Sequence, residues 1–143
     1  MSANDIDWEA LRATAETARA RAYAPYSGFE VGAALLAEDG RVFAGANVEN
    51  ASYGLSSCAE RNALGAAVTA GARRFLAIVI VTPGPGPTSP CGMCRQVLSE
   101  FAPSFPLRCH ADDGTLLEST VAELLPSAFG PENLLDRGAR GGD

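Results

Sequence analysis

The sequence predicts an α/β protein in which a β-sheet is covered by helices on both of its faces. Some segments place apolar residues at helical spacing, others form short strand-like runs bounded by turns, and residues 75–82 are apolar almost throughout. The order of these segments is helix, two strands, helix, strand, helix, two strands, helix, which is typical of such a layered fold. Residues 1–143 are expected to form one domain, because two would each be too small for a stable core.

The first half of the chain is expected to form a helix, a hairpin and a second helix. Asp5 or Asp7 can cap the first helix, and Pro25 ends it. Its apolar face consists of residues spaced by three and four, namely Trp8, Leu11, Ala15, Ala18 and Ala22. Residues 30–37 and 41–48 are expected to pair as strands around the turn Glu38-Asp39-Gly40. Residues 58–70 form the next predicted helix, which Gly71 ends.

The second half begins with a strand over residues 75–82, whose continuous apolar run indicates burial on both faces. A helix is predicted over residues 91–101, with Ser89 as its cap and Pro90 at its first position. Two short strands, 107–111 and 115–119, flank the turn Asp112-Asp113-Gly114, a last helix begins at 121–125, and the tail 137–143 is expected to be loose. The Pro/Gly loop 83–87 is expected on the surface, and the sequence assigns it no role.

Composition and charge exclude several classes of partner. The formal net charge is −6, and all 11 basic residues are arginines with a single adjacent pair, so we expect no nucleic acid polymer as partner. The longest apolar run is far shorter than the roughly 20 residues of a membrane helix, so no membrane partner is expected. The acidic N-terminus does not resemble a signal peptide, which favours a cytoplasmic location. A small neutral or cationic ligand suits this balance of charge.

Three cysteines form a pattern typical of a zinc site. Cys91 and Cys94 are three residues apart at the start of a predicted helix, where free backbone N–H groups and the helix dipole favour thiolates. Such a pair alone is weak evidence, but Cys58 also opens a helix and is followed by Glu60. Cys-Ala-Glu, followed about thirty residues later by Pro-Cys-x-x-Cys, matches the signature of the zinc deaminases, with cysteine as the first ligand.

The chemistry of these residues points to a catalytic zinc rather than a structural one. Three protein ligands leave the fourth zinc position open for water. Glu60 is then not a ligand but the group that takes the water's proton and passes protons to the substrate. Arg61 could donate hydrogen bonds to the cysteine sulfurs and offset the negative charge of three thiolates.

With these motifs in view, the chain resembles the cytidine deaminases. The resemblance is carried by segments 47–61 and 90–98, supported by 25–36 and 124–134, and covers nearly the whole chain to about Leu134. It implies a three-layer α/β/α sandwich with a five-stranded mixed sheet, and a homotetramer with one catalytic Zn²⁺ per subunit. The implied reaction is the hydrolytic deamination of cytidine and 2′-deoxycytidine to uridine and 2′-deoxyuridine with release of ammonia.

The resemblance also implies the residues that contact the nucleoside. Asn47 and Glu49 are two residues apart at a strand end, so their side chains face the same way, and an amide with a carboxylate can bind a hydroxyl. By resemblance they hold the ribose 3′-OH. The other implied contacts are Phe29 near the base, Ala51 and Tyr53 in the nucleoside-contacting stretch, and Phe129, which a neighbouring subunit contributes.

Several alternatives for single residues stay open at this point. Ser57 and Glu60 form a capping-box pattern, which would give Glu60 only a structural role. Cys109 could be a fourth ligand that closes a structural zinc site, or a simple buried thiol. His110, on the opposite strand face, is expected to be structural or at the surface, and Arg95 receives no role. Without the resemblance, the two phenylalanines would be assigned to the core, Asn47 to a turn, Tyr53 to a subunit interface and Arg61 to a solvated helix face.

The activity also has alternatives. Blasticidin S deaminase shares the zinc motifs but differs before the first cysteine, where this chain keeps Asn47-Val-Glu49, and other modified cytosine nucleosides are conceivable substrates. A polynucleotide deaminase would need a basic track for the strand. The non-enzymatic alternative is a structural zinc module that binds a partner.

Overall fold

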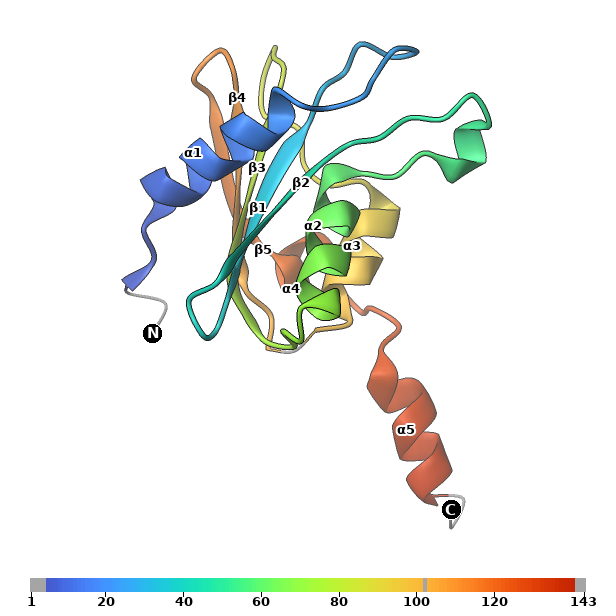
Figure 1. Cartoon of the computed structure of the whole chain (residues 1–143). Helices are drawn as coiled ribbons and strands as arrows, with labels where there is room; N and C mark the ends of the chain where they lie inside the picture. The colour runs from blue at the N-terminus through green and yellow to red at the C-terminus, as the bar shows by residue number, and fades with distance from the viewer. Residues whose placement is uncertain (1–4, 102, 141–143) are drawn as a thin grey trace.

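The fold is a five-stranded mixed sheet between helices, seen in a computed structural model that describes residues 5–101 and 103–140 (Figure 1). The strand order is β2-β1-β3-β4-β5; β3 and β4 run parallel, and the other neighbours are antiparallel. The strands are β1 (Gly32–Ala37), β2 (Val42–Ala46), β3 (Phe75–Thr82), β4 (Pro106–Ala111) and β5 (Leu116–Thr120). The predicted strands are all present, with ends that differ by one or two residues from those expected, except β3, whose bounds agree.

Helices cover both faces of the sheet, which confirms the predicted three layers. Helix α1 (Trp8–Arg19) packs on one face, while α2 (Ala59–Thr69), α3 (Gly92–Ser99) and the short α4 (Val121–Leu124) lie on the other (Figure 1). Strand β3 sits in the middle of the sheet and supplies both cores, Ile78 and Ile80 to the α2 side and Val79 and Val81 to the α1 side. Its continuous apolar run follows from this double burial.

Helix α1 begins and packs as its sequence predicts, but it ends earlier. The Asp7 carboxylate accepts a hydrogen bond from the Ala10 N–H at 3.0 Å, so Asp7 is the cap. Leu11 and Ala15 are fully buried against β1. The contact is so close that a Cβ on Gly32 would lie 2.0 Å from the Ala15 carbonyl oxygen. The helix ends at Arg19, well before Pro25.

The start of α3 differs from the expectation. Cys91 is the cap residue, and its carbonyl accepts the first helical hydrogen bond from the Arg95 N–H at 3.0 Å. Ser89 and Pro90 lie before the helix, where the Ser89 hydroxyl oxygen accepts from Arg95 Nη2 at 2.7 Å. The Ser89 hydroxyl therefore serves the arginine side chain instead of the helix end.

The C-terminal helix α5 (Pro131–Arg140) was not predicted. Residues 137–140, expected in a loose tail, continue this helix, and residues 141–143 lie outside the described part of the chain. Pro131 is pre-set for a first helical position, and the Asn133 side chain accepts from the Gly130 N–H at 2.8 Å. Gly138 inside the helix weakens its sequence signal. Figure 1 shows α5 extending away from the sheet.

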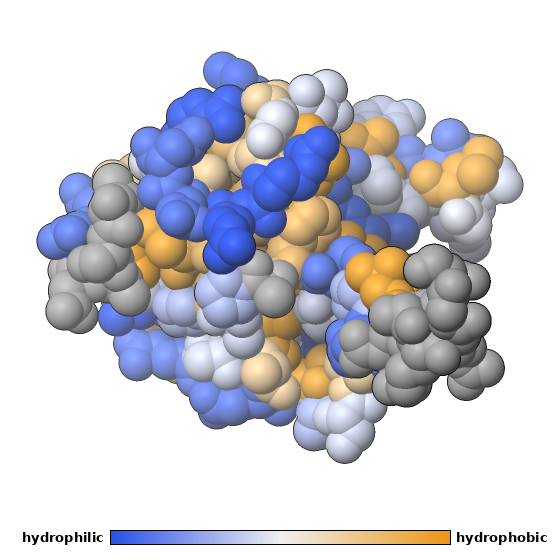
Figure 2. All heavy atoms as spheres, turned by 90° about the horizontal axis from the view of Figure 1, so that it is seen from below, coloured by the Kyte–Doolittle hydropathy of each residue, from blue (hydrophilic) through white to orange (hydrophobic). Residues whose placement is uncertain are grey.

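The surface mixes hydrophilic and hydrophobic residues. On the face seen in Figure 2, hydrophobic residues reach the surface in separate patches between hydrophilic ones. Within 5–101 and 103–140, no helix has both the length and the apolar character needed to cross a bilayer. The cytoplasmic location stays a prediction.

Candidate active site

The three predicted zinc ligands lie together at the ends of two helices. Cys58 is the cap residue of α2, Cys91 is the cap residue of α3, and Cys94 lies in the first turn of α3. Their sulfur atoms all lie within 4.8 Å of one another, and Cys58 Sγ is 3.9 Å from Cys91 Sγ. Tetrahedral thiolate ligands on one zinc stand about 3.8 Å apart, so the Cys58–Cys91 pair has this spacing and the distances to the third sulfur exceed it by at most about 1 Å. No other such cluster of metal-binding side chains occurs in the described residues.

The surroundings of the cluster stabilise negative charge on sulfur. Hydrogen bonding to the Cys94 thiol, together with Arg61, lowers the pKa of Cys58 to about 5. The hydrogen bond with Cys58, and then burial, raise the pKa of Cys94. Without metal the pair thus keeps one proton, which zinc binding must release.

Arg61 lies against the cluster as predicted. Its Nη2 donates to Cys58 Sγ at 3.6 Å and to the Ser56 carbonyl oxygen at 3.3 Å. The hydrogen bond to Cys58, and then the charges of Cys58 and Cys94, raise the pKa of Arg61. Arg61 Nε is the one buried side-chain nitrogen or oxygen without a hydrogen-bond partner among the described residues. A cation held this close offsets part of the charge of three thiolates.

Glu60 is buried in the first turn of α2, with 5% of its surface exposed. Burial raises the pKa of Glu60, and the charge of Cys58 adds to this shift. A bound divalent cation nearby would oppose it. The capping-box alternative is wrong, because Cys58 and not Ser57 occupies the cap position and no side chain caps the helix.

A cavity of about 350 Å³ opens beside the cysteine cluster. Its lining includes Cys58, Glu60 and Cys91, and also three predicted substrate-contacting residues, Phe29, Asn47 and Glu49. This size is within the range of small-molecule pockets. The cysteine cluster, a buried carboxylate and an aromatic ring therefore line the same cavity.

Asn47 and Glu49 both face this cavity and both hold the segment that carries Phe29. Asn47 Nδ2 donates to the Phe29 carbonyl oxygen at 2.8 Å, and its Oδ1 accepts from the Val31 N–H at 2.9 Å. The Glu49 carboxylate accepts from the N–H groups of Tyr26 and Ser27 at 2.9 and 3.1 Å and from the Ser27 hydroxyl. The bond from the Ser27 hydroxyl holds the pKa of Glu49 below its usual value, so the side chain is a carboxylate at neutral pH.

Three other predicted contacts do not line this cavity in the single chain. Ala51 is exposed in the loop before the short 3₁₀ helix η2 (Tyr53–Leu55). The Tyr53 ring stands edge-on to the Tyr26 ring, with centroids 5.8 Å apart, and lines a neighbouring pocket with Ser27 and Glu49. Phe129 is 59% exposed, and its carbonyl oxygen accepts from Gln96 Nε2 at 2.8 Å.

Cys109 and His110 lie apart from the cluster on opposite faces of β4. Cys109 is fully buried in the core on the α2 side, and burial raises its pKa to about 12. It is not a member of the metal-binding group, which argues against a closed four-cysteine site. His110 is buried near the charges of α1, and burial lowers its pKa.

Sequence reasoning missed the role of Arg95 and two threonines that line the cavity. Arg95 is not a solvated charge: Nε donates to the Pro90 carbonyl oxygen at 2.8 Å and Nη1 to the Leu124 carbonyl oxygen at 2.9 Å, besides the bond to Ser89. Thr82 and Thr88 line the cavity from the end of β3 and the following loop. Thr82 could have been found from the sequence, because it is a polar residue at the end of an apolar strand and ligand-binding sites often lie at strand ends.

Comparison with known proteins places this geometry in a class. Residues 6–105 match the family model described as "Cytidine and deoxycytidylate deaminase zinc-binding region". Fold, cysteine cluster and this match define a zinc-binding deaminase.

The relatives are more specific. A cytidine deaminase of Sporosarcina psychrophila is 50% identical over 130 residues, which is 90% of this chain and 96% of that protein. One from Halalkalibacterium halodurans is 48% identical over 92% of this chain and 100% of that protein. The crystal structure of cytidine deaminase from Burkholderia pseudomallei superposes with a TM-score of 0.83 at 49% identity, covering 87% of this chain and 100% of that chain. The chain belongs to the cytidine deaminase family.

Proposed function

We propose that the protein catalyses the hydrolytic deamination of cytidine and 2′-deoxycytidine with one Zn²⁺ per subunit. The observation that carries this proposal is the buried carboxylate of Glu60 in the same cavity as Cys58 and Cys91. The products are uridine or 2′-deoxyuridine and ammonia: water supplies the new C4 oxygen, the bond from C4 to the amino nitrogen breaks, and that nitrogen leaves as ammonia.

The residues around the cavity have separate roles in the reaction, namely metal binding, proton transfer and charge compensation. Cys58, Cys91 and Cys94 would hold Zn²⁺, which would act as a Lewis acid and make water in the cavity a stronger acid. Glu60 takes a proton from that water and delivers protons to the substrate and the departing amine. Arg61 donates to Cys58 Sγ and so limits the negative charge that three thiolates would place beside the reacting water.

Substrate orientation falls to the cavity-lining residues outside the cysteine cluster. Phe29 offers an aromatic face beside the base, and the amide and carboxylate of Asn47 and Glu49 offer a donor and an acceptor for the ribose 3′-OH. Their present bonds to residues 26–31 keep both side chains in place before the nucleoside arrives.

The direct test is an ultraviolet assay of the purified, zinc-loaded protein on cytidine, 2′-deoxycytidine, cytosine, CMP and blasticidin S. We expect turnover of the first two. Turnover of blasticidin S without turnover of cytidine would contradict the proposal in favour of a modified-cytosine nucleoside. A protein that binds zinc and turns over none of the five would be a structural zinc module.

The sugar contact makes a second expectation. 3′-Deoxycytidine and free cytosine should be poor substrates while 2′-deoxycytidine stays good, because the first two cannot form the hydrogen bonds of the 3′-OH with Asn47 and Glu49, a loss of about 1–3 kcal/mol. Glu49→Ala should slow the reaction and reduce the discrimination between cytidine and 3′-deoxycytidine. We would compare kcat/KM for both nucleosides in both proteins, and equal values for cytosine and cytidine would exclude the contact.

We further propose a homotetramer in which Phe129 completes the cavity of a neighbouring subunit. Phe129 follows the end of α4 by five residues, beyond Pro126, and its side chain is mostly exposed. Other large apolar side chains are exposed as well, namely Tyr23, Tyr26, Val48, Tyr53, Leu55, Met93, Leu134 and Leu135. So much exposed apolar surface on one small chain supports burial between subunits.

Mixing two variants tests this sharing. Phe129→Ala should raise KM without loss of zinc, while Glu60→Gln removes turnover. In a hetero-oligomer, some sites would combine an intact Glu60 from one chain with an intact Phe129 from another. Reassembled mixtures, verified by native mass spectrometry, should then show low-KM activity above either parent. Activity that only averages the parents would place Phe129 in its own subunit.

A further inference from the structure

We propose that the acidic turn Asp112–Asp113, between β4 and β5, is a positioning device for one wall of the substrate cavity. It acts by fixing the Pro/Gly loop 83–87, to which the sequence assigned no role. The inference rests on the proposed deaminase function. It assigns a role in substrate binding to residues that lie apart from the cysteine cluster in the sequence.

The turn binds the loop through successive backbone groups. Asp112 Oδ1 accepts from the Gly84 N–H at 2.8 Å, and Asp113 Oδ2 accepts from the Gly86 N–H at 2.9 Å. The Asp112 N–H also donates to the Thr82 carbonyl oxygen at 3.0 Å. Every second residue from Thr82 to Gly86 is therefore held by Asp112 or Asp113.

The contact leaves little room for a side chain on the loop. A Cβ on Gly84 would lie 3.1 Å from Asp113 Oδ2 and 3.2 Å from Asp112 Oδ1, tighter than ordinary packing. Gly86 has a φ of +74°, which residues with a Cβ rarely adopt. The hydrogen bonds from Gly86 and Thr115 hold the pKa of Asp113 at about 2, so it is a carboxylate throughout the physiological range.

The loop leads directly into the cavity wall. Thr88 and Ser89 follow it and line the same cavity as Glu60. Ser89 is held on its other side by Arg95 Nη2 at 2.7 Å. The segment from β3 to α3 is thus fixed by the acidic turn at its start and by Arg95 at its end.

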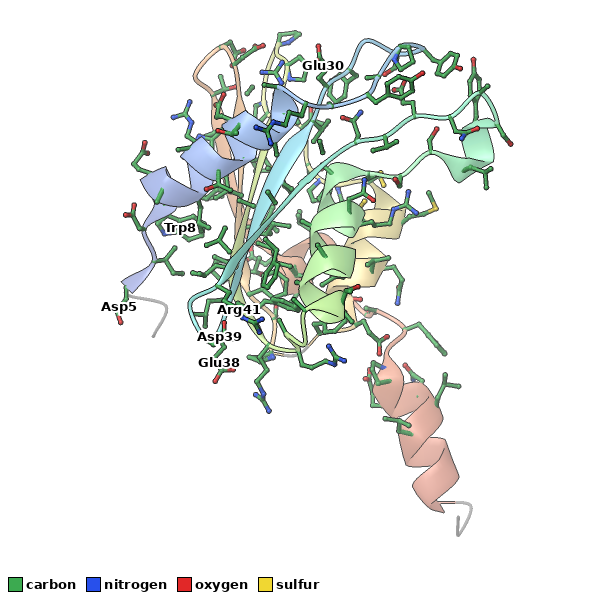
Figure 3. All side chains as sticks on the ribbon, viewed as in Figure 1. Asp5, Trp8, Glu30, Glu38, Asp39 and Arg41 are labelled. Atoms are coloured by element: carbon green, nitrogen blue, oxygen red, sulfur yellow. The ribbon has the colours of Figure 1, made fainter. Side chains whose placement is uncertain are left out.

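Arg19 links the turn to a second segment of the cavity lining, the one that carries Phe29. Its Nη2 donates to Asp112 Oδ2 at 3.3 Å, and its Nε donates to the Glu30 carbonyl oxygen at 2.9 Å. Glu30 follows Phe29, which lines the cavity. Figure 1 shows the end of α1, the loop after β3 and the β4–β5 turn at one end of the sheet, and Figure 3 labels Glu30 there. One turn therefore braces two of the segments that line the cavity.

The chain offers a matched control at the other end of the sheet. Asp39 lies in the β1–β2 turn, where its carboxylate accepts from the Arg41 N–H at 3.1 Å and pairs with Arg41 Nε at 2.8 Å. Figure 3 shows Asp39 and Arg41 at the end of the sheet opposite Glu30. Asp39→Ala thus removes a turn aspartate of similar exposure and bonding without touching the cavity.

The experiment compares Asp112→Ala, Asp113→Ala and Asp39→Ala in the zinc-loaded enzyme. We expect the first two to raise KM for cytidine about 3- to 10-fold, with kcat within about twofold and one zinc per subunit, because a lost loop contact weakens binding more than chemistry. Asp112→Asn and Asp113→Asn should recover most of the loss, since the amide oxygen still accepts a hydrogen bond. Asp39→Ala should leave KM unchanged.

Hydrogen exchange of the Gly84 and Gly86 amides gives a readout that does not depend on turnover. Both amides should lose protection in the two alanine variants and keep it in Asp39→Ala. An unchanged KM in Asp112→Ala and Asp113→Ala, or an equal rise in Asp39→Ala, would overturn the proposal even if the amides respond. A wild-type protein that does not deaminate cytidine would instead overturn the proposed function. In that case, unchanged exchange of the Gly84 and Gly86 amides in Asp112→Ala and Asp113→Ala would show that the turn does not fix the loop.

Discussion

Glu60→Gln should lower the deamination rate at least about 100-fold while the zinc content stays at one per subunit. Glutamine has the size of glutamate and suits the buried position in α2, so the fold should persist. It cannot take a proton from water, and general acid–base catalysis contributes about 100- to 10,000-fold. Stability should not fall, because the buried carboxylate itself carries a desolvation cost that the amide lacks.

The measurement is kcat on cytidine, with zinc counted by atomic absorption and the melting temperature recorded. Glu100→Gln, at the exposed end of α3, is the control, because it makes the same chemical change away from the cavity. We expect its kcat to equal that of the wild type. Near-normal turnover in Glu60→Gln would remove Glu60 from the reaction.

The sequence predicted the layered fold and the metal cluster because both depend on local signals. The apolar run of β3 and the apolar spacing of α1 indicate burial directly, and Cys91 and Cys94, three residues apart at the start of one helix, lie on the same side of it wherever that helix packs. The third ligand, Cys58, came from a motif whose chemistry is specific. Burial of Glu60 follows from its place in the first turn of a helix packed on the sheet.

Features that depend on contacts between distant segments of the chain could not be predicted from the sequence. Ser89 resembles a helix cap in sequence, but its hydroxyl is engaged by Arg95, so the helix begins at Cys91. The Arg95 side chain meets Leu124 only because α3 and α4 pack together. Pairing of Asp113 with Gly86 depends on the parallel neighbours β3 and β4, which bring the loop after one beside the turn after the other. Spacing along the chain contains no record of these contacts.

Cys91→Ser and Cys94→Ser should each lower zinc affinity at least about 100-fold and abolish deamination at ordinary zinc concentrations. Serine hydroxyls remain protonated near neutral pH and are poor zinc ligands, so either change leaves two thiolates. Both variants should also melt at lower temperature, because the three sulfurs lie within 4.8 Å and the metal joins the starts of α2 and α3. The larger loss of stability is expected for Cys94→Ser, since that site is fully buried.

Cys109→Ser is the matched control, because it makes the same atomic change in a buried cysteine outside the cluster. It should keep one zinc per subunit and its kcat, with some loss of stability from the buried hydroxyl. A chelator should then lower the melting temperatures of the wild type and Cys109→Ser while leaving Cys91→Ser unmoved, because only the first two have metal to lose. Zinc loss in Cys109→Ser with zinc retained in Cys91→Ser would instead show that the metal is held by a different set of sulfurs, and Glu60 would then lose its metal-activated water.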